Sequence, residues 1–126
     1  MVCKPFITND VLYRSCHQIH FDYEKNEPKI TAFLPRKTDG DYTSVQCQMN
    51  RPKEDVLRFF FDNFTDHVGY FTFTINDCKT KNIKCCDDTD PPLSYHSRVE
   101  FKGERPQRIY TAKVLSKISS YEKYDI

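Results

Sequence analysis

The chain has 126 residues, and its 19 basic and 18 acidic side chains give a formal net charge of +1. This length is typical of one domain with one core, and the near-neutral charge argues against a general nucleic-acid binder. No apolar stretch is long enough to cross a bilayer, and the N-terminus turns polar too early for a secretory leader. We therefore expect a single cytoplasmic domain over residues 1–126, with no membrane partner.

Cysteine usage adds to this expectation about the compartment. The chain has six cysteines, an even number that would fit a disulfide framework in a secreted domain. Because no leader is recognised and disulfides are rare in the cytosol, we predict free thiols. The cysteines are Cys3, Cys16, Cys47, Cys78, Cys85 and Cys86.

The N-terminal part of the chain contains three predicted strands. Residues 10–15 are β-prone, residues 30–34 form a second candidate closed by Pro35, and residues 42–49 form a third. The polar segment between the first two is expected to be a surface connection. An Asp-Gly turn over residues 37–41 leads into the third strand, so a hairpin is expected there.

Residues 50–76 are the centre of the predicted fold. Asn50 is a suitable helix cap and Pro52 suits a first turn. Apolar side chains then recur at the spacing of one helix face, which must be covered. After Gly69, residues 70–75 alternate apolar residues with threonine, as in a half-buried strand, and we expect helix and strand to cover each other. The apolar helix positions are Val56, Leu57, Phe60, Phe61 and Phe64.

The C-terminal half contains further short elements. A β-prone piece lies at residues 83–86, residues 93–102 alternate as a strand, and residues 107–119 have the pattern of a closing helix. The tail, residues 121–126, is expected to be frayed. Short strands interrupted by two helices predict an α+β fold, with a small, mainly antiparallel sheet packed by one central amphipathic helix and a C-terminal helix.

Short motifs are spread over most of the chain: Tyr13-Arg14, Ala32-Phe33, the run 41–45 (Asp-Tyr-Thr-Ser-Val), and His96-Ser97-Arg98-Val99 followed by Gly103. Together they resemble the landmarks of a family of small uncharacterised prokaryotic proteins. The resemblance implies no particular activity. It implies membership of accessory or defence-type gene sets, such as toxin–antitoxin-type systems.

Arg14, Ser44 and His96 fall on three separate predicted strands and belong to these motifs. A guanidinium can hold a phosphate or carboxylate through parallel hydrogen bonds, a serine hydroxyl can position it, and a histidine can move a proton near neutral pH. If the three converge, they predict a catalytic or sensing pocket for a nucleotide-like or phosphate-bearing ligand. The alternative is a structural hydrogen-bond network within the sheet, with Ser44 solvated.

Two groups of residues have the chemistry of metal ligands, but neither has the paired spacing of a structural zinc site. Adjacent cysteines in a strand would also point to opposite faces of the sheet. We therefore predict no metal. The groups are His17, His20 and Asp22, and Cys78, Cys85, Cys86 and Asp87.

Enzyme motifs give equally little support. Glu100-Phe101-Lys102 has the acid-x-lysine spacing of metal-dependent nucleases, but residues 27–29 and 77–79 repeat this spacing, so it carries little information. With only three glycines, the chain has no phosphate-binding loop or dinucleotide fingerprint. We therefore expect no cofactor.

The C-terminal third is basic. A patch on the last strand and helix is one way to contact RNA or an acidic protein. Such a run is also common on a solvated helix face. The candidate binding residues are Arg98, Lys102, Arg105 and Arg108.

Two hypotheses of function follow. The first is an accessory or binding subunit, part of a prokaryotic defence or toxin–antitoxin-type system, that contacts a protein partner or RNA through its aromatic surface or basic face. The alternative is an enzyme or sensor that acts on a nucleotide-like ligand through Arg14, Ser44 and His96. The sequence leaves open whether the protein is an enzyme.

Overall fold

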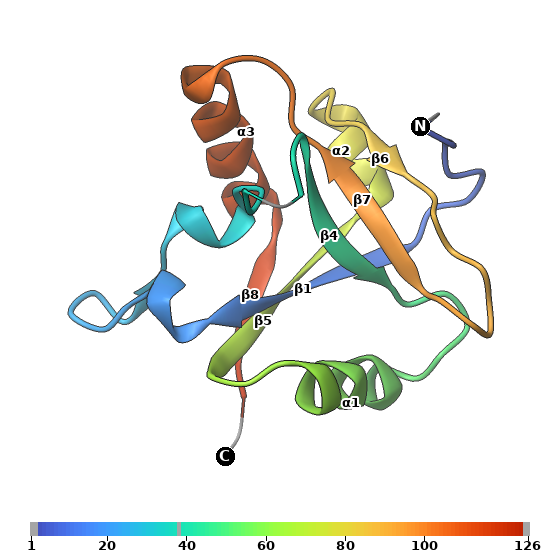
Figure 1. Cartoon of the computed structure of the whole chain (residues 1–126), viewed down its shortest axis with the longest axis horizontal. Coiled ribbons are helices and arrows are strands. Elements are labelled where there is room, and N and C mark those ends of the chain that lie inside the picture. Colours follow the sequence, from blue (N-terminus) through green and yellow to red (C-terminus); the bar gives the residue numbers. More distant parts are fainter. Residues whose placement is uncertain (1–2, 38, 125–126) are drawn as a thin grey trace.

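A computed structural model describes residues 3–37 and 39–124. Six strands form one sheet in the order β6-β7-β4-β1-β5-β8, and its neighbouring strands are antiparallel (Figure 1). The α+β class with a mainly antiparallel sheet, predicted from the sequence, is confirmed. The six strands are β1 (Val11–His17), β4 (Tyr42–Cys47), β5 (His67–Thr74), β6 (Cys85–Cys86), β7 (His96–Glu100) and β8 (Ser120–Lys123), while β2 (Phe21–Asp22) and β3 (Glu27–Pro28) form a separate small hairpin.

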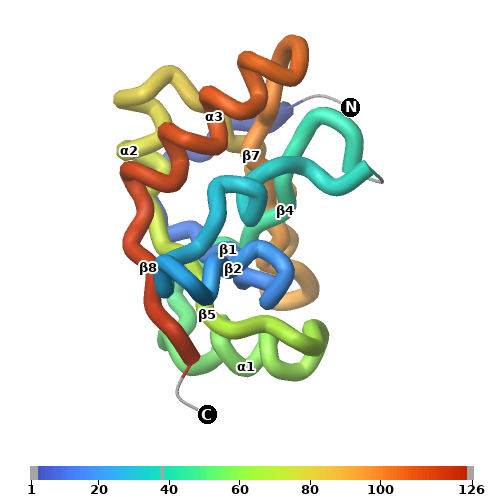
Figure 2. Tube along the Cα trace, turned by 90° about the vertical axis from the view of Figure 1, so that its left-hand side faces the viewer, coloured from blue at the N-terminus to red at the C-terminus, as the bar shows by residue number. Residues whose placement is uncertain are grey.

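Helices pack on both faces of the sheet. Helix α1 (Lys53–Asn63) packs on one face, and α2 (Ile75–Thr80) and α3 (Arg105–Ile118) pack on the other. Figure 2 shows α1 at one end of the molecule, away from α2 and α3. The 3₁₀ helices η1 (Gln18–His20) and η2 (Ile30–Phe33) lie in the connection from β1 to β4. None of the helices in the described part of the chain has both the length and the apolar composition needed to cross a membrane.

The larger core lies between the sheet and α3. Leu12 of β1, Phe71 of β5, Phe33 of η2 and Leu115 of α3 are each at most 1% exposed. The rings of Phe33 and Phe71 have centroids 4.4 Å apart. Since alternate residues of a strand point to the same face, β5 presents Phe71 and Phe73 together to this core.

The smaller core lies under α1. Val56 and Phe60 pack against Tyr13 of β1 and Tyr70 of β5, on the face of β5 that also carries its threonines. The sequence pattern suggested that the central helix covers the phenylalanine face of β5. The structure differs, because α3 and η2 fill that side and α1 covers the opposite face. The bodies of the two tyrosines supply the apolar surface for α1.

The apolar face of α1 is only partly covered. Phe61 is 57% exposed and Phe64 is 40% exposed, which corrects the expectation that all five apolar positions are buried. Tyr13 and Tyr70 form a narrow platform, and Val56 with Phe60 fills it. Phe61 instead lies beside the ring of Tyr124, with the two centroids 4.7 Å apart.

The segment predicted as the second strand is the 3₁₀ helix η2. Its adjacent residues Ala32 and Phe33 are both buried, whereas a strand would send neighbouring side chains to opposite faces. The expected hairpin with β4 is therefore replaced by a 3₁₀ turn and a loop. In the Asp-Gly turn predicted over residues 37–41, Gly40 has a φ of +69°, and Thr38 lies outside the described residues.

Helix α2 and strand β8 are among the elements that the sequence-based prediction does not include. Helix α2 begins where the Thr74 hydroxyl accepts a hydrogen bond from the backbone N–H of Asp77, a typical helix cap. Strand β8 includes residues 121–123 of the tail expected to be frayed, and it pairs with β5. A side chain at Gly69 would lie 2.5 Å from the carbonyl oxygen of Glu122, so the glycine permits this pairing. Residues 125–126 of the tail lie outside the described residues.

Two of the cysteines are bonded to each other. A disulfide joins Cys3 to Cys86 across a sequence separation of 83 residues and ties the N-terminal segment to β6. The prediction of free thiols is therefore wrong at these two positions. The sequence does not show the disulfide because a long-range pairing leaves no local pattern. The other four cysteines, Cys16, Cys47, Cys78 and Cys85, are buried free thiols.

Candidate functional site

The main candidate site is an opening between two neighbouring strands. β1 and β4 pair only at Leu12↔Cys47 and Tyr13↔Gln46, whereas β1 pairs with β5 from Val11↔Thr74 to His17↔His67. Beyond Tyr13 the strands β1 and β4 diverge, as Figure 1 shows. The result is a cavity of about 630 Å³, lined by β1, β4, η1, η2, α1 and the starts of β5 and β7. This volume lies in the range of small-molecule binding sites.

The cavity collects residues that are far apart in the sequence. The predicted residues Arg14, Ser44 and His96 all line it. The chain has four histidines, His17, His20, His67 and His96, and all four line the same cavity. An imidazole ring can donate and accept hydrogen bonds, so the histidines make this part of the wall polar.

Arg14 is the main fixed positive charge at the cavity wall. Its Nε donates to the Ala32 carbonyl oxygen at 3.1 Å, and its Nη1 donates to the Ser44 carbonyl oxygen at 2.9 Å. Burial, with a smaller effect of Arg36, lowers the pKa of Arg14 to about 10, so the guanidinium stays charged at neutral pH. No carboxylate of the described residues lies within ion-pair distance of it.

His67 is held in a chain of hydrogen bonds at the cavity wall. Its Nδ1 lies 2.7 Å from Ser15 Oγ, which lies 2.9 Å from the Tyr124 hydroxyl. The ring stacks on Phe64, and its edge meets the ring of His17. Burial, followed by the nearby His17 and Arg14, lowers the pKa of His67 to about 4. The ring is therefore neutral at pH 7.

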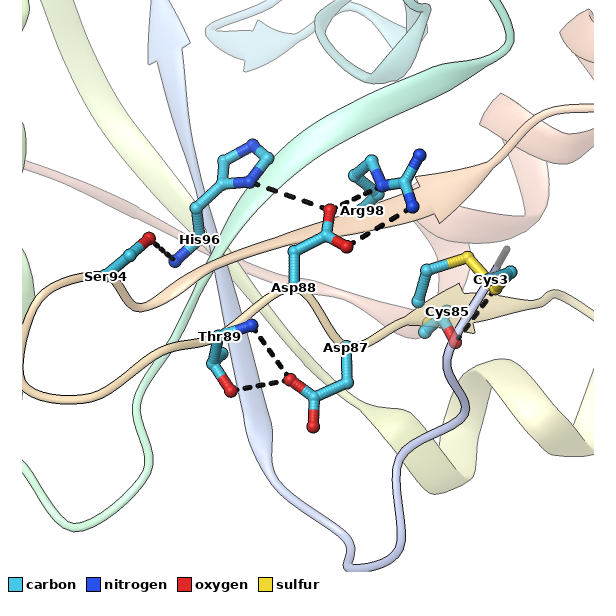
Figure 3. A network of polar contacts seen from close by, with 9 residues as sticks. Cys3, Cys85, Asp87, Asp88, Thr89, Ser94, His96 and Arg98 are labelled. Carbon is cyan, nitrogen blue, oxygen red and sulfur yellow. Dashed lines mark hydrogen bonds and ion pairs between the residues drawn. A yellow bond between two sulfur atoms is a disulfide. The ribbon is translucent and has the colours of Figure 1, made fainter. Parts of the chain in front are cut away.

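His96 lies at the opposite side of the cavity, next to a buried ion pair. Its Nδ1 is 4.0 Å from Asp88 Oδ2, and Asp88 is mainly engaged by Arg98, whose Nε lies 2.5 Å from the same oxygen (Figure 3). Burial lowers the pKa of His96 more than Asp88 raises it. The guanidinium of Arg98 also lies over the ring of Tyr42, 4.8 Å from its centroid. Asp88 thus lies close to His96 without raising the pKa of the ring above its ordinary value.

The third part of the wall is aromatic. Phe59, Phe60 and Phe64 of the α1 segment line the cavity. Phe64 contributes its stacked pair with His67, whose ring centroids lie 4.8 Å apart with an interplanar angle of 13°. The exposure of Phe64 therefore has a place in the site, because its ring packs on His67 and also lines the cavity. Flat rings of this kind are suited to stacking on a planar ligand.

The basic residues predicted as a macromolecule-binding patch do not form a group of free cations. Arg98 is paired with Asp88, Lys102 Nζ lies 3.7 Å from Glu100 Oε1, and Arg108 pairs with Asp41. Arg105 is exposed at the start of α3. Contact of this face with RNA or a protein partner stays a prediction.

Sequence reasoning missed Ser15, Arg36 and His67 as parts of the site. The sequence pattern predicts a strand that begins only at residue 70, so it puts His67 in a loop, whereas β5 begins at His67. Ser15 lies on the same face of β1 as Tyr13 and His17 and is buried. A strand prediction extended to residue 67 would have paired His67 with the His17 region and shown this cluster.

Comparison of the chain with protein-family models, with curated proteins and with solved structures found no match. The resemblance to a prokaryotic family therefore stays a prediction. In the described part of the chain, the one group of three residues whose ligand atoms lie close enough to hold a metal is Cys3, Cys86 and Glu100. That group lies outside the histidine-lined cavity.

Proposed function

We propose that this protein binds an anionic small molecule with a planar ring, such as a nucleotide, in the histidine-lined cavity. The observation that carries the proposal is Arg14, a partly buried guanidinium at the cavity wall without a carboxylate partner among the described residues. A buried charge is costly unless it is paired. An incoming phosphate or carboxylate would supply the missing counter-charge.

The hydrogen bonds of Arg14 leave room for such an anion. A guanidinium has five N–H donors in a planar fork. The carbonyl oxygens of Ala32 and Ser44 take Nε and Nη1, and they hold the fork in place. The remaining N–H groups are available to a ligand. Because the fork is fixed before binding, little conformational entropy is lost when an anion arrives.

The remaining lining groups extend the anion site. Arg36 also lines the cavity, and its Nε donates to Asp39 Oδ2 at 2.9 Å. Ser44 and the histidines of the lining supply hydrogen bonds that fix orientation, as in most small-molecule sites. The aromatic wall of α1 then offers a stacking surface for a base. The cavity thus has an anion end, a polar middle and an aromatic wall.

Binding of defined compounds tests this proposal. Adenosine monophosphate, adenosine and inorganic pyrophosphate separate the contributions of ring and anion, and calorimetry gives the affinity of each. We expect the monophosphate to bind at least about tenfold more tightly than adenosine, because a charge-assisted hydrogen bond contributes about 1.5–3 kcal/mol.

Three arginine variants supply the controls. Arg14→Gln should abolish the preference for the monophosphate, but it also disturbs the carbonyl groups that Arg14 holds. Arg36→Gln, at a side chain that is 67% exposed, should weaken monophosphate binding without loss of folding. Arg58→Gln, on an exposed arginine of α1 outside the cavity lining, should change nothing. The proposal fails if none of the three compounds binds, or if both cavity variants bind the monophosphate like the wild type.

A further inference from the structure

A second cluster of reactive side chains lies at the β6 edge of the sheet, outside the cavity lining. Cys86 of β6 is buried, and Cys3 approaches it from the N-terminal segment. Glu100 stands at the end of β7, two positions beyond Arg98, the partner of Cys86 in the ladder. The two sulfur atoms and a carboxylate oxygen of Glu100 all lie within 4.8 Å of one another. Figure 3 shows Cys3 beside Cys85 at this edge.

Glu100 has an unsatisfied oxygen. Its Oε2 is excluded from solvent and has no hydrogen-bond partner among the described residues. Its Oε1 is 3.7 Å from Lys102 Nζ, whose side chain is 73% exposed. A buried carboxylate oxygen without a partner costs free energy. A cation between Glu100 and the two sulfur atoms would remove this cost.

We propose that Cys3, Cys86 and Glu100 form a zinc site when the Cys3–Cys86 disulfide is reduced. In the first step two molecules of a small thiol reduce the disulfide: their sulfurs form a new disulfide, and Cys3 and Cys86 each gain a proton and one electron. In the second step Zn²⁺ binds both sulfurs as thiolates and releases two protons to solvent. Glu100 supplies the third ligand, and water completes the tetrahedron.

The donor set selects the metal. Thiolate ligands favour zinc over calcium or magnesium, which prefer oxygen ligands. Two thiolates on a tetrahedral zinc lie about 3.8 Å apart, as Zn–S bonds of about 2.3 Å require. After reduction the two sulfurs therefore have to move apart from disulfide bonding distance to this separation, while the carboxylate already lies near both of them. Two thiolates and one carboxylate leave a net charge of about −1 around Zn²⁺, and Lys102 lies close enough to offset it.

The disulfide and the zinc site exclude each other, since one pair of sulfur atoms serves both. In oxidising surroundings the N-terminal segment is tied to β6 by a covalent bond. Under reducing conditions with zinc present, the metal makes the same connection. The position of the N-terminal segment on the sheet is thus preserved in both conditions.

Zinc titration of the reduced and oxidised chain tests the proposal. The full-length protein is reduced with excess thiol, desalted without oxygen, and titrated with zinc chloride against a chromogenic chelator. We expect one Zn²⁺ per chain for the reduced protein and none for the oxidised protein. Cobalt chloride added to the reduced protein should give the absorption bands of thiolate-bound cobalt.

Variants assign the ligands. Cys3→Ser and Cys86→Ser should lose the site, and Glu100→Gln should weaken zinc binding by at least about tenfold, the loss that even an outer-shell partner can cause. Cys47→Ser, at a buried thiol outside the cluster, should bind zinc like the wild type. Cys3 precedes the first strand, so its variant keeps the test valid if Cys86→Ser does not fold. The proposal is overturned if the reduced wild type takes up no zinc, or if Cys3→Ser binds as tightly.

Discussion

At the scale of single residues, Arg14 shows how much local sequence can say. Its place in a β-prone run and in one of the short motifs is enough to predict it as an anion ligand. The sequence could not show that its guanidinium lacks a carboxylate partner, since that depends on which acidic side chains fold next to it. Ser44 contributes through its backbone carbonyl oxygen, which no residue type would have indicated.

His67 gives a prediction about pH. Its folded-state pKa of about 4 lies below the usual value of 6.5, so the unfolded chain binds a proton more readily. The stability associated with neutral His67 is therefore complete above about pH 6.5 and is lost as the pH falls towards 4. His20 and His96 have lowered pKa values and act in the same direction. We expect urea denaturation to show this loss over that interval.

A variant separates His67 from the carboxyl groups that titrate at lower pH. His67→Gln keeps a hydrogen-bonding side chain next to Ser15 but removes the titration. Its free energy of unfolding should fall less steeply than that of the wild type between pH 6.5 and 4. Parallel curves for the two proteins would show that His67 does not have the lowered pKa.

At the scale of elements, α1 offers a test with two residues of the same type. Phe60 is 3% exposed and packs on Tyr13 and Tyr70, while the adjacent Phe61 is 57% exposed. Phe60→Ala should lower the free energy of unfolding by about 3–5 kcal/mol, because it removes a buried ring and leaves a cavity. Phe61→Ala should cost less than about 1 kcal/mol. Urea denaturation measures both, and equal losses would contradict the described packing of α1.

Element type and approximate position were the most predictable part of the fold. Strong periodicity found α1, α3, β4, β5 and β7. Periodicity failed at the tyrosines of β1 and β5, which have an apolar ring and a polar hydroxyl. Their rings form the surface on which α1 packs, although threonines on the same face of β5 make that face look polar in the sequence. Periodicity also failed at η2, because a short apolar run in a sequence is compatible with either a strand or a helical turn. Here two adjacent residues are both buried, which the 3₁₀ turn allows. β8 escaped because its pairing depends on Gly69, far away in the sequence.

At the scale of the whole molecule, the disulfide links the two ends of a long segment. Reduction in the presence of a chelator should lower the free energy of unfolding by about 2–4 kcal/mol, since the unfolded chain regains the freedom of a long loop. Calorimetry of wild type and Cys3→Ser, with and without reductant, measures this. Reductant should shift the melting temperature of the wild type and leave that of the variant unchanged. An equal shift in both proteins would show that the reductant does not act through the Cys3–Cys86 disulfide.

The candidate site could be predicted only in part because it belongs to the whole molecule. Its residues come from seven elements, and the cavity exists because η1, η2 and α1 surround the place where β1 and β4 separate. Sequence patterns indicate which faces are buried, but they do not show where two paired strands part. For the same reason the sequence does not predict the cluster of Cys3, Cys86 and Glu100, because its three members are brought together only by the fold.

The short pairing of β1 with β4 has a consequence for how this scaffold can diversify. The cavity exists because the main chains of β1 and β4 diverge. Replacing one lining side chain by another therefore changes the shape of the cavity without disrupting the sheet. Positions such as Ser44 and Phe64 could therefore drift or be engineered to admit different guests. The same backbone could thus bind different ligands, with the ligand preference set by a few lining side chains.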